Sequence, residues 1–160
     1  MANPTVALTR IDNRLIHGQV ASQWTRETKA DILLVASDET AADKFRQELM
    51  NMAAPAGVTT MYVPVDDVKK VLEEKCGDKR VMILVANPLD AKRLQEAGVK
   101  IERLNIGNMH MAEGKHQVAT TVAVDDTDKA YLKQLADNGA ELFIQRVPGS
   151  PEEPLEKLWK

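Results

Sequence analysis

A short stretch near the N-terminus, TRIDNRLIHGQ, combines side chains that could transfer a phosphoryl group. It contains Arg10, Asp12, Arg14 and His17, and Gly18 follows where a helix is expected to begin. A histidine at a helix start lies near free backbone N–H groups and the positive end of the helix dipole, which favour its neutral, nucleophilic form and attract phosphate. The planar fork of Arg14 could bind two oxygens of one phosphate, and Asp12 could orient a ring nitrogen or an arginine. These are the requirements of phosphoryl transfer.

The same residues also permit less specific interpretations. His17 could be a surface or capping residue, and the two arginines could form a surface ion network with Asp12 that contributes little to stability. A zinc site built from His17, His110 and His116 is disfavoured, because no pair of these histidines has a tight ligand spacing. We therefore expect no metal site.

The composition limits the class of protein. The 160 residues amount to one domain, and 21 Lys and Arg against 24 Asp and Glu give a net charge of −3, which excludes a generally cationic nucleic-acid binder. Cys76 is the single cysteine, so a disulfide framework is excluded and a structural or incidental role is expected. No apolar stretch approaches the length of a membrane-spanning helix and no signal peptide is visible, so a cytoplasmic protein is expected.

Short apolar runs alternate with longer amphipathic segments along the chain. Strands are predicted at 6–9, 31–36, 58–63, 81–86, 103–106, 118–124 and 141–147. Helices are predicted at 18–28, 41–54, 66–75, 88–97 and 126–138. This alternation predicts an α/β fold: a single domain over 1–160 with a mostly parallel, twisted sheet of about seven strands and helices on both faces.

Ligands of such a sheet bind beyond the carboxyl ends of the strands, which places the candidate site in the strand-to-helix loops. These loops are predicted at 10–18, 37–40, 87–88 and 107–114. The methionines of 50–52 and 109–111 are expected to fill the core. The proline-rich segment 148–160 is expected to form a C-terminal arm with a final helical turn at 155–159. Trp159 is expected to pack on its own domain, and docking on a second copy or another subunit is the alternative.

The string RIDNRLIHGQV at 10–20 resembles the active-site loop of the enzyme IIB subunits of the mannose/fructose/sorbose family of the bacterial sugar phosphotransferase system. The resemblance continues through NIGNMHMAEGKHQV at 105–118, VDD at 124–126 and GAELFIQRVP at 139–148, and so covers nearly the whole chain in order. Within the family, the sequence of the 105–110 segment and the short length of the chain are most similar to those of N-acetylgalactosamine-type members.

The resemblance implies a phosphocarrier. His17 would be phosphorylated on Nδ1 by a phosphohistidine of the IIA protein, and the group would pass to a sugar held by the membrane subunits IIC and IID. Arg14 matches the phosphate-facing arginine, and Asp12 matches a second polar position of the catalytic loop. Arg10, Gly18 and Gln19 are expected to complete the phosphate- and partner-binding surface. No cofactor is implied, and a homo-oligomer stays open.

Two alternatives belong to other classes of protein. A nucleotide- or flavin-binding α/β module would share the strand and helix pattern, although the chain has neither GxGxxG after the first strand nor GxxxxGK[ST]. Bound cofactor absorbance would favour that module. A regulatory binding protein without catalysis is the second alternative, and the presence of both His17 and Arg14 weighs against it.

Overall fold

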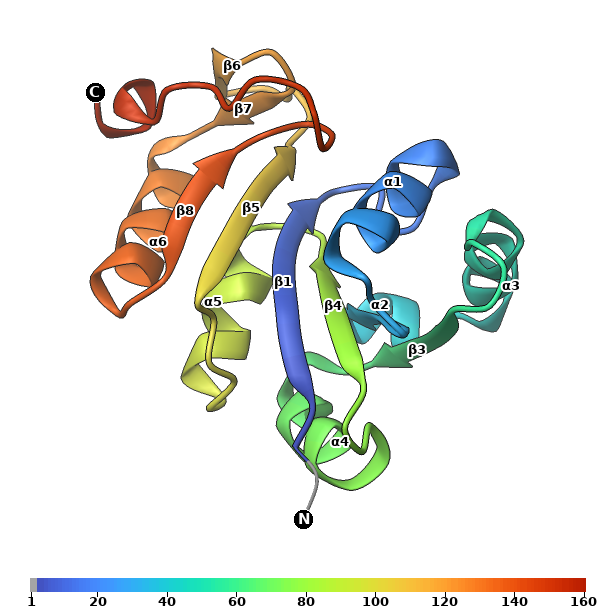
Figure 1. Cartoon of the computed structure of the whole chain (residues 1–160). Coiled ribbons are helices and arrows are strands. Elements are labelled where there is room, and N and C mark those ends of the chain that lie inside the picture. The colour runs from blue at the N-terminus through green and yellow to red at the C-terminus, as the bar shows by residue number, and fades with distance from the viewer. Residues whose placement is uncertain (1–2) are drawn as a thin grey trace.

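A six-stranded parallel sheet forms the centre of the computed structural model, which describes residues 3–160 (Figure 1). Its strand order is β3-β2-β4-β1-β5-β8. The strands are β1 (Thr5–Asp12), β2 (Ile32–Ala36), β3 (Thr59–Val63), β4 (Arg80–Val85), β5 (Arg103–Asn108) and β8 (Glu141–Ile144). Met1 and Ala2, which the prediction of one domain over 1–160 included, lie outside the described residues.

Helices cover both faces of this sheet, as predicted. They are α1 (Gly18–Thr28), α2 (Asp38–Ala41), α3 (Lys44–Ala53), α4 (Val68–Lys75), α5 (Pro88–Glu96) and α6 (Asp126–Asp137). One apolar core joins α1 and α3 to the sheet through Trp24 and Met50, and the other joins α4, α5 and α6 through Leu72, Leu94 and Leu132. The fold class predicted from the sequence is therefore confirmed.

The central strands form where the sequence is most continuously apolar. All five residues of β2 are buried, and so are five of the six residues of β4. A parallel strand covered by helices on both sides needs apolar side chains in both directions, so it does not alternate. Side chains cap the helices that follow: Ser37 begins α2, Asp43 begins α3, Asn87 begins α5 and Asp125 begins α6.

Several predicted elements are wrong in detail. The predicted strand 141–147 ends at Ile144, the predicted helix 66–75 begins as a 3-10 helix at Val65–Asp67, and most of the predicted loop 37–40 is the short helix α2. The predicted strand 118–124 is a separate antiparallel pair, β6 (His116–Ala119) and β7 (Val122–Val124), because the chain turns between them. The predicted helix 41–54 is divided, since Asp43 leaves the helical conformation and caps α3. The amphipathic pattern of this segment was also misleading, because Phe45 and Met52 are 70% and 83% exposed while Met50 is buried.

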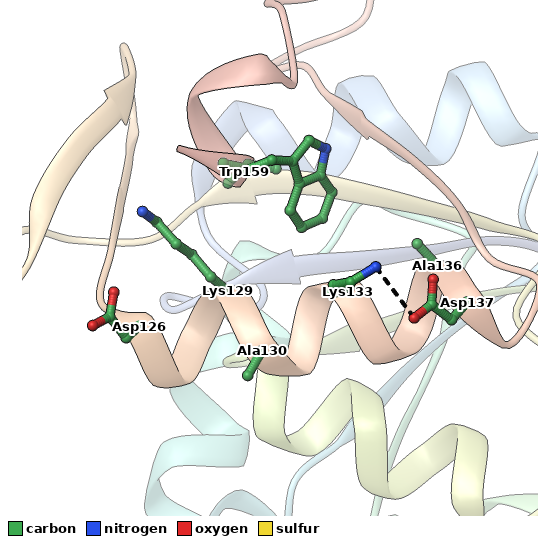
Figure 2. A pocket seen from close by; sticks show the side chains of 8 residues that line it. Asp126, Lys129, Ala130, Lys133, Ala136, Asp137 and Trp159 are labelled. Atoms are coloured by element: carbon green, nitrogen blue, oxygen red, sulfur yellow. Dashed lines mark ion pairs between the residues drawn. The ribbon is translucent and has the colours of Figure 1, made fainter.

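The segment 148–160 runs back over β6 and β7 and ends in a 3-10 helix at Glu156–Trp159. Leu158 is the fully buried side chain of this segment. Of the two methionines at 109–111, Met109 is buried in the core and Met111 is exposed. Trp159 is about half exposed and lies over α6 beside Lys129 and Lys133, where it lines a hollow of about 580 Å³ (Figure 2). The arm therefore packs on its own domain mainly through Leu158.

Candidate functional site

The first strand carries two of the candidate residues, because β1 continues to Asp12 and does not end at Thr9 as predicted. Arg10 and Asp12 lie inside the sheet, and both are buried, with Arg10 only 1% exposed. The expectation that Arg10 lies on the phosphate- and partner-binding surface is therefore wrong, because its side chain is buried. Its burial comes from neighbours on β5, which pairs with β1 at Arg10 and Asn105.

The Arg10 guanidinium is held by hydrogen bonds from both terminal nitrogens. Nη1 donates to Asn105 Oδ1 and, at 3.2 Å, to the carbonyl oxygen of Gln145, while Nη2 donates to Asp12 Oδ2 at 3.0 Å. The Trp24 indole of α1 covers the guanidinium, with 5.3 Å between Cζ and the ring centroid. Burial lowers the pKa of Arg10, and the neighbouring Asp12 carboxylate opposes this effect. A buried cation without such partners would be very costly.

Asp12 connects the functional side chains to one another. Its Oδ2 faces Arg10, and its Oδ1 accepts hydrogen bonds from the backbone N–H of Arg14 at 2.9 Å and from Arg14 Nε at 3.3 Å. The His17 ring lies on the same side, with 3.9 Å between Nδ1 and Oδ2, which is too long for a hydrogen bond. One buried carboxylate thus positions two arginines and lies next to the histidine.

The imidazole of His17 is partly enclosed. Its side chain is 26% exposed, yet both ring nitrogens are buried and have no hydrogen-bond partner among residues 3–160. The exposed part of this side chain therefore consists of carbon atoms. Burial lowers the pKa of His17, the Asp12 carboxylate raises it, and the positive charge of Arg14 lowers it further. The net direction favours the neutral ring, which is the nucleophilic form.

The loop after β1 delivers His17 to the start of α1. The chain turns back at Leu15, which has a φ of 61° and donates its N–H to Asp12 O at 2.9 Å. His17 is the N-cap residue of α1, but its side chain makes no capping hydrogen bond, and the first turn carries no acidic residue. The backbone N–H groups of Gly18 and Gln19 precede the first intrahelical bond, so this helix end can bind an anion.

The side chain of Arg14 lies at the open side of this arrangement. It is 43% exposed, and Asp12 binds only its Nε end. Among the hydrogen bonds of residues 3–160, none uses the two terminal Nη atoms of Arg14. Its fork is therefore available to two oxygens of a phosphate, while Asp12 fixes the stem.

The sequence matches that of a known family. The chain matches the family model described as the PTS system sorbose subfamily IIB component over residues 6–160. The chain belongs to this family of phosphotransferase system IIB components.

Relatives and solved structures agree with this assignment. The IIB component is 45% identical to the mannose-specific EIIAB component of Escherichia coli K12 over 148 residues, 92% of this chain and 46% of that protein. It therefore spans about half the length of that relative. It is 39% identical to the N-acetylgalactosamine-specific enzyme IIB component 2 of Escherichia coli K12 over 155 residues, 97% of this chain and 99% of that protein.

The fold comparison extends over nearly the whole IIB component. The crystal structure of the N-acetylgalactosamine-specific IIB component 1 from Escherichia coli has a TM-score of 0.89 at 35% identity, covering 94% of this chain and 99% of that one. The IIBSor domain of the sorbose permease from Klebsiella pneumoniae has a TM-score of 0.90 at 32% identity, covering 96% of both chains. The alternative of a nucleotide- or flavin-binding module has no support in these findings.

The four segments predicted as strand-to-helix loops, 10–18, 37–40, 87–88 and 107–114, meet at the same edge of the sheet. Residues from all four line a polar hollow of about 480 Å³. It includes Asn13, Ser37, Asn87 and His110, and Arg46 of α3 lines it as well. Ser37 and Asn87 use their side-chain oxygens to cap helices, so these two residues shape the hollow. The prediction of a site at the carboxyl ends of the strands is consistent with this arrangement.

The remaining candidates lie elsewhere or do no chemistry in this geometry. Within residues 3–160, no cluster of three or more His, Cys, Asp or Glu is arranged to hold a metal ion, so His17, His110 and His116 do not form a zinc site. Cys76 is buried at the end of α4, and burial raises the pKa of its thiol. Across the same residues, no helix is long and apolar enough to cross a membrane.

Three residues around Arg10 were missed by sequence reasoning, namely Trp24, Asn105 and Gly107. Trp24 lies within the predicted helix 18–28 and is typical of a core residue, but its Nε1 also donates to Arg146 O at 3.1 Å. Asn105 is fully buried between Leu104 and Ile106. A polar side chain inside an apolar strand was the available signal, because such a group must find a buried partner.

Proposed function

We propose that His17 carries the phosphoryl group of this IIB component, between a phosphohistidine of IIA and a sugar imported through the membrane subunits IIC and IID. The proposal concerns the residue, the partners and the substrate class; the relatives named above include mannose-, N-acetylgalactosamine- and sorbose-specific proteins. The chain would work in the cytoplasm, beside its membrane subunits.

The transfer is a displacement at phosphorus. A ring nitrogen of neutral His17 donates its lone pair to the phosphorus, while the bond from phosphorus to the donor imidazole breaks and its electron pair stays on that imidazole. The N–H proton of His17 is lost and the donor imidazole takes up one proton, so both rings end neutral. In the second step a sugar hydroxyl attacks the phosphorus, the bond from phosphorus to His17 breaks with its electron pair on the ring, and the hydroxyl proton passes to the His17 ring, which returns to its neutral form. Charge on the equatorial oxygens would be balanced by the Arg14 fork and by the N–H groups of Gly18 and Gln19, so the proposal invokes no cofactor.

The observation that carries the proposal is the pairing of His17 with an uncapped helix end. Side chains cap α2, α3, α5 and α6, whereas at α1 the capping position holds His17 and its imidazole makes no capping bond. The N–H groups that a cap would satisfy are thus left for a ligand. Arg14 stands beside them with an unused fork, held by Asp12.

Phosphorylation would require the ring to move. Both nitrogens are buried, and Nδ1, the expected acceptor, lies on the side of Asp12. A phosphoryl group at that position would meet the carboxylate, so rotation of the imidazole toward the helix end would relieve the repulsion. The two unpaired nitrogens make such a rotation inexpensive, because no hydrogen bond within the described residues is lost.

The test uses the complete donor chain. Phosphoenolpyruvate, the general phosphotransferase proteins and the cognate IIA should label the protein, and the label should be acid-labile and base-stable, as expected of a phosphohistidine. His17→Ala should abolish labelling, while His110→Ala, which changes an exposed histidine of the neighbouring hollow, should retain it. Labelling of His17→Ala, or a label on Cys76, would contradict the assignment.

A further inference from the structure

Gly107 forms one wall of the space that holds the Arg10 guanidinium. Gly107 is a buried residue of β5. The pairing of β5 with β1 places it beside Arg10. A Cβ atom built on Gly107 would overlap with Cζ, Nη1 and Nη2 of Arg10. The Trp24 ring also lies next to the guanidinium, with 5.3 Å between Cζ and the ring centroid. The guanidinium thus occupies a slot bordered by a strand backbone and an indole.

Hydrogen bonds fix the guanidinium within this slot. Gln145 O accepts from Arg10 Nη1 and from Asn105 Nδ2, the latter at 3.1 Å, and Asn105 Oδ1 accepts from Arg10 Nη1 as well. The remaining terminal nitrogen, Nη2, therefore points at Asp12 Oδ2. Asp12 is itself fully buried, so it has little freedom to adjust if the guanidinium is displaced.

We propose that Gly107 is a positioning residue for phosphoryl transfer, acting through Arg10 and Asp12 on His17 and Arg14. The absence of a side chain lets the guanidinium lie against β5, and this position sets the carboxylate that contacts both Arg14 and the His17 side of the site. The expected effect of Gly107 on catalysis rests on the proposed function, whereas the slot around Arg10 is independent of that function.

The backbone of Gly107 makes the position suitable for a clean substitution. Its φ lies outside the left-handed region, so alanine can adopt the same strand conformation. The atoms that alanine would meet belong to the end of a flexible side chain, which can move without unfolding the sheet. Gly107→Ala therefore tests the space for Arg10, with little strain on the backbone.

The experiment compares Gly107→Ala with Ile106→Val, measuring the rate of phosphorylation by IIA, the thermal midpoint and the NMR signal of the Trp24 indole N–H. The side chain of Ile106 packs in the core that does not contain Trp24 and takes no part in the hydrogen bonds of Arg10, so Ile106→Val reports loss of packing alone. We expect Gly107→Ala to slow phosphorylation roughly tenfold or more, as misplacement of about 1 Å can do, and to shift the indole signal. Ile106→Val should do neither.

The effect of Gly107→Ala is also measured in a protein that already carries Arg10→Lys. In Arg10→Lys, the ammonium lacks the broad fork and leaves room for a methyl group, so adding Gly107→Ala should cause no further slowing. An equal loss in both backgrounds, or a wild-type rate in Gly107→Ala, would overturn the proposal. An unchanged Trp24 signal would overturn the slot whatever His17 does, whereas labelling of His17→Ala would contradict only the proposed function.

Discussion

At the residue scale, the two ends of the Arg14 guanidinium have different roles. Its Nε end is held by Asp12, while its Nη atoms face the open side of the site. Arg14→Lys keeps the charge but removes the planar fork, so it should leave the fold intact and slow phosphorylation by about a hundredfold or more, the usual cost of losing one charge-stabilising donor. Stopped-flow or quench-flow rates with phosphorylated IIA give the comparison. A wild-type rate would reduce Arg14 to a surface ion-pair partner.

His17 should give the protein a defined response to acid. Burial sets its pKa below the ordinary value of about 6.5, so the nucleophile stays neutral at mildly acidic pH and phosphorylation should decline only as pH falls through the lowered pKa. The unfolded chain takes up this proton at higher pH than the folded one. His17 therefore contributes stability that is complete above about pH 6.5 and is lost as pH falls through the folded pKa.

An NMR titration of the His17 ring measures that pKa directly. Unfolding free energies of the wild type and of His17→Gln, which does not titrate, should diverge between about pH 6.5 and the folded pKa, with the wild type losing more. A folded pKa above the ordinary value would show that the Asp12 carboxylate outweighs burial, and the acid response would then have the opposite sign.

At the scale of the element, the first turn of α1 has opposite requirements for stability and for function. A negative charge near a helix N-terminus stabilises the helix by about 0.3–1 kcal/mol, but it repels phosphate. Gln19→Glu should therefore raise or preserve the thermal midpoint while it slows phosphorylation. Gln23→Glu, one turn later on the same helix, is the matched control and should change the rate little. If both variants slow transfer equally, net charge rather than the helix end controls the reaction.

Element prediction succeeded where local pattern determines structure. The bounds of α1 were predicted to the residue, and the apolar runs of β2 and β4 identified central strands. It failed where the outcome depends on distant partners. Arg10 at the end of an apolar run is typical of a loop, yet Asn105 and the carbonyl of Gln145 keep it in the sheet. Phe45 fits a helical apolar face but points to solvent.

The same distinction holds for the site. The chemistry of the site could be predicted from the sequence, because His17, Arg14 and Asp12 are close in sequence and are residue types that bind or transfer phosphate. Its supporting contacts were not, since Trp24 and Gly107 look like an ordinary core residue and an ordinary strand glycine. Only the close approach of β5 to Arg10 gives Gly107 a meaning, and that approach is a property of the assembled sheet.

On the scale of the whole molecule, the protein carries a net charge of −3, and the rim near His17 presents the cationic side chain of Arg14. The adjacent hollow carries charges of both signs, with Arg46 and Lys115 beside Asp38, Glu39 and Asp90. A phosphorylated partner brings negative charge to this rim, so we expect association with IIA that is micromolar or weaker, with an on-rate that falls as salt rises toward a screening length of about 8 Å. Transient contacts of this kind typically bury less than about 1,200 Å².

NMR shift mapping with IIA locates this interface. Changes should concentrate on residues 10–24 and on the loops 37–40 and 107–114, which line or adjoin the polar hollow. Within residues 10–24, Arg10 is expected to respond only indirectly because it is buried. Changes confined to residues 148–160, with the His17 loop unaffected, would contradict this docking site and assign partner binding to the C-terminal arm.

The contacts around Arg10 have a consequence for protein synthesis. Arg10 binds the carbonyl of a residue 135 positions later in the chain, and Trp24 binds one 122 positions later. A ribosome therefore exposes the His17 segment well before the segment that completes its surroundings. Until that later segment has emerged, Asp12 lacks its fixed cation, so the nascent chain would be a poor phosphoryl acceptor. We therefore expect competence for transfer to arise only once β8 has joined the sheet.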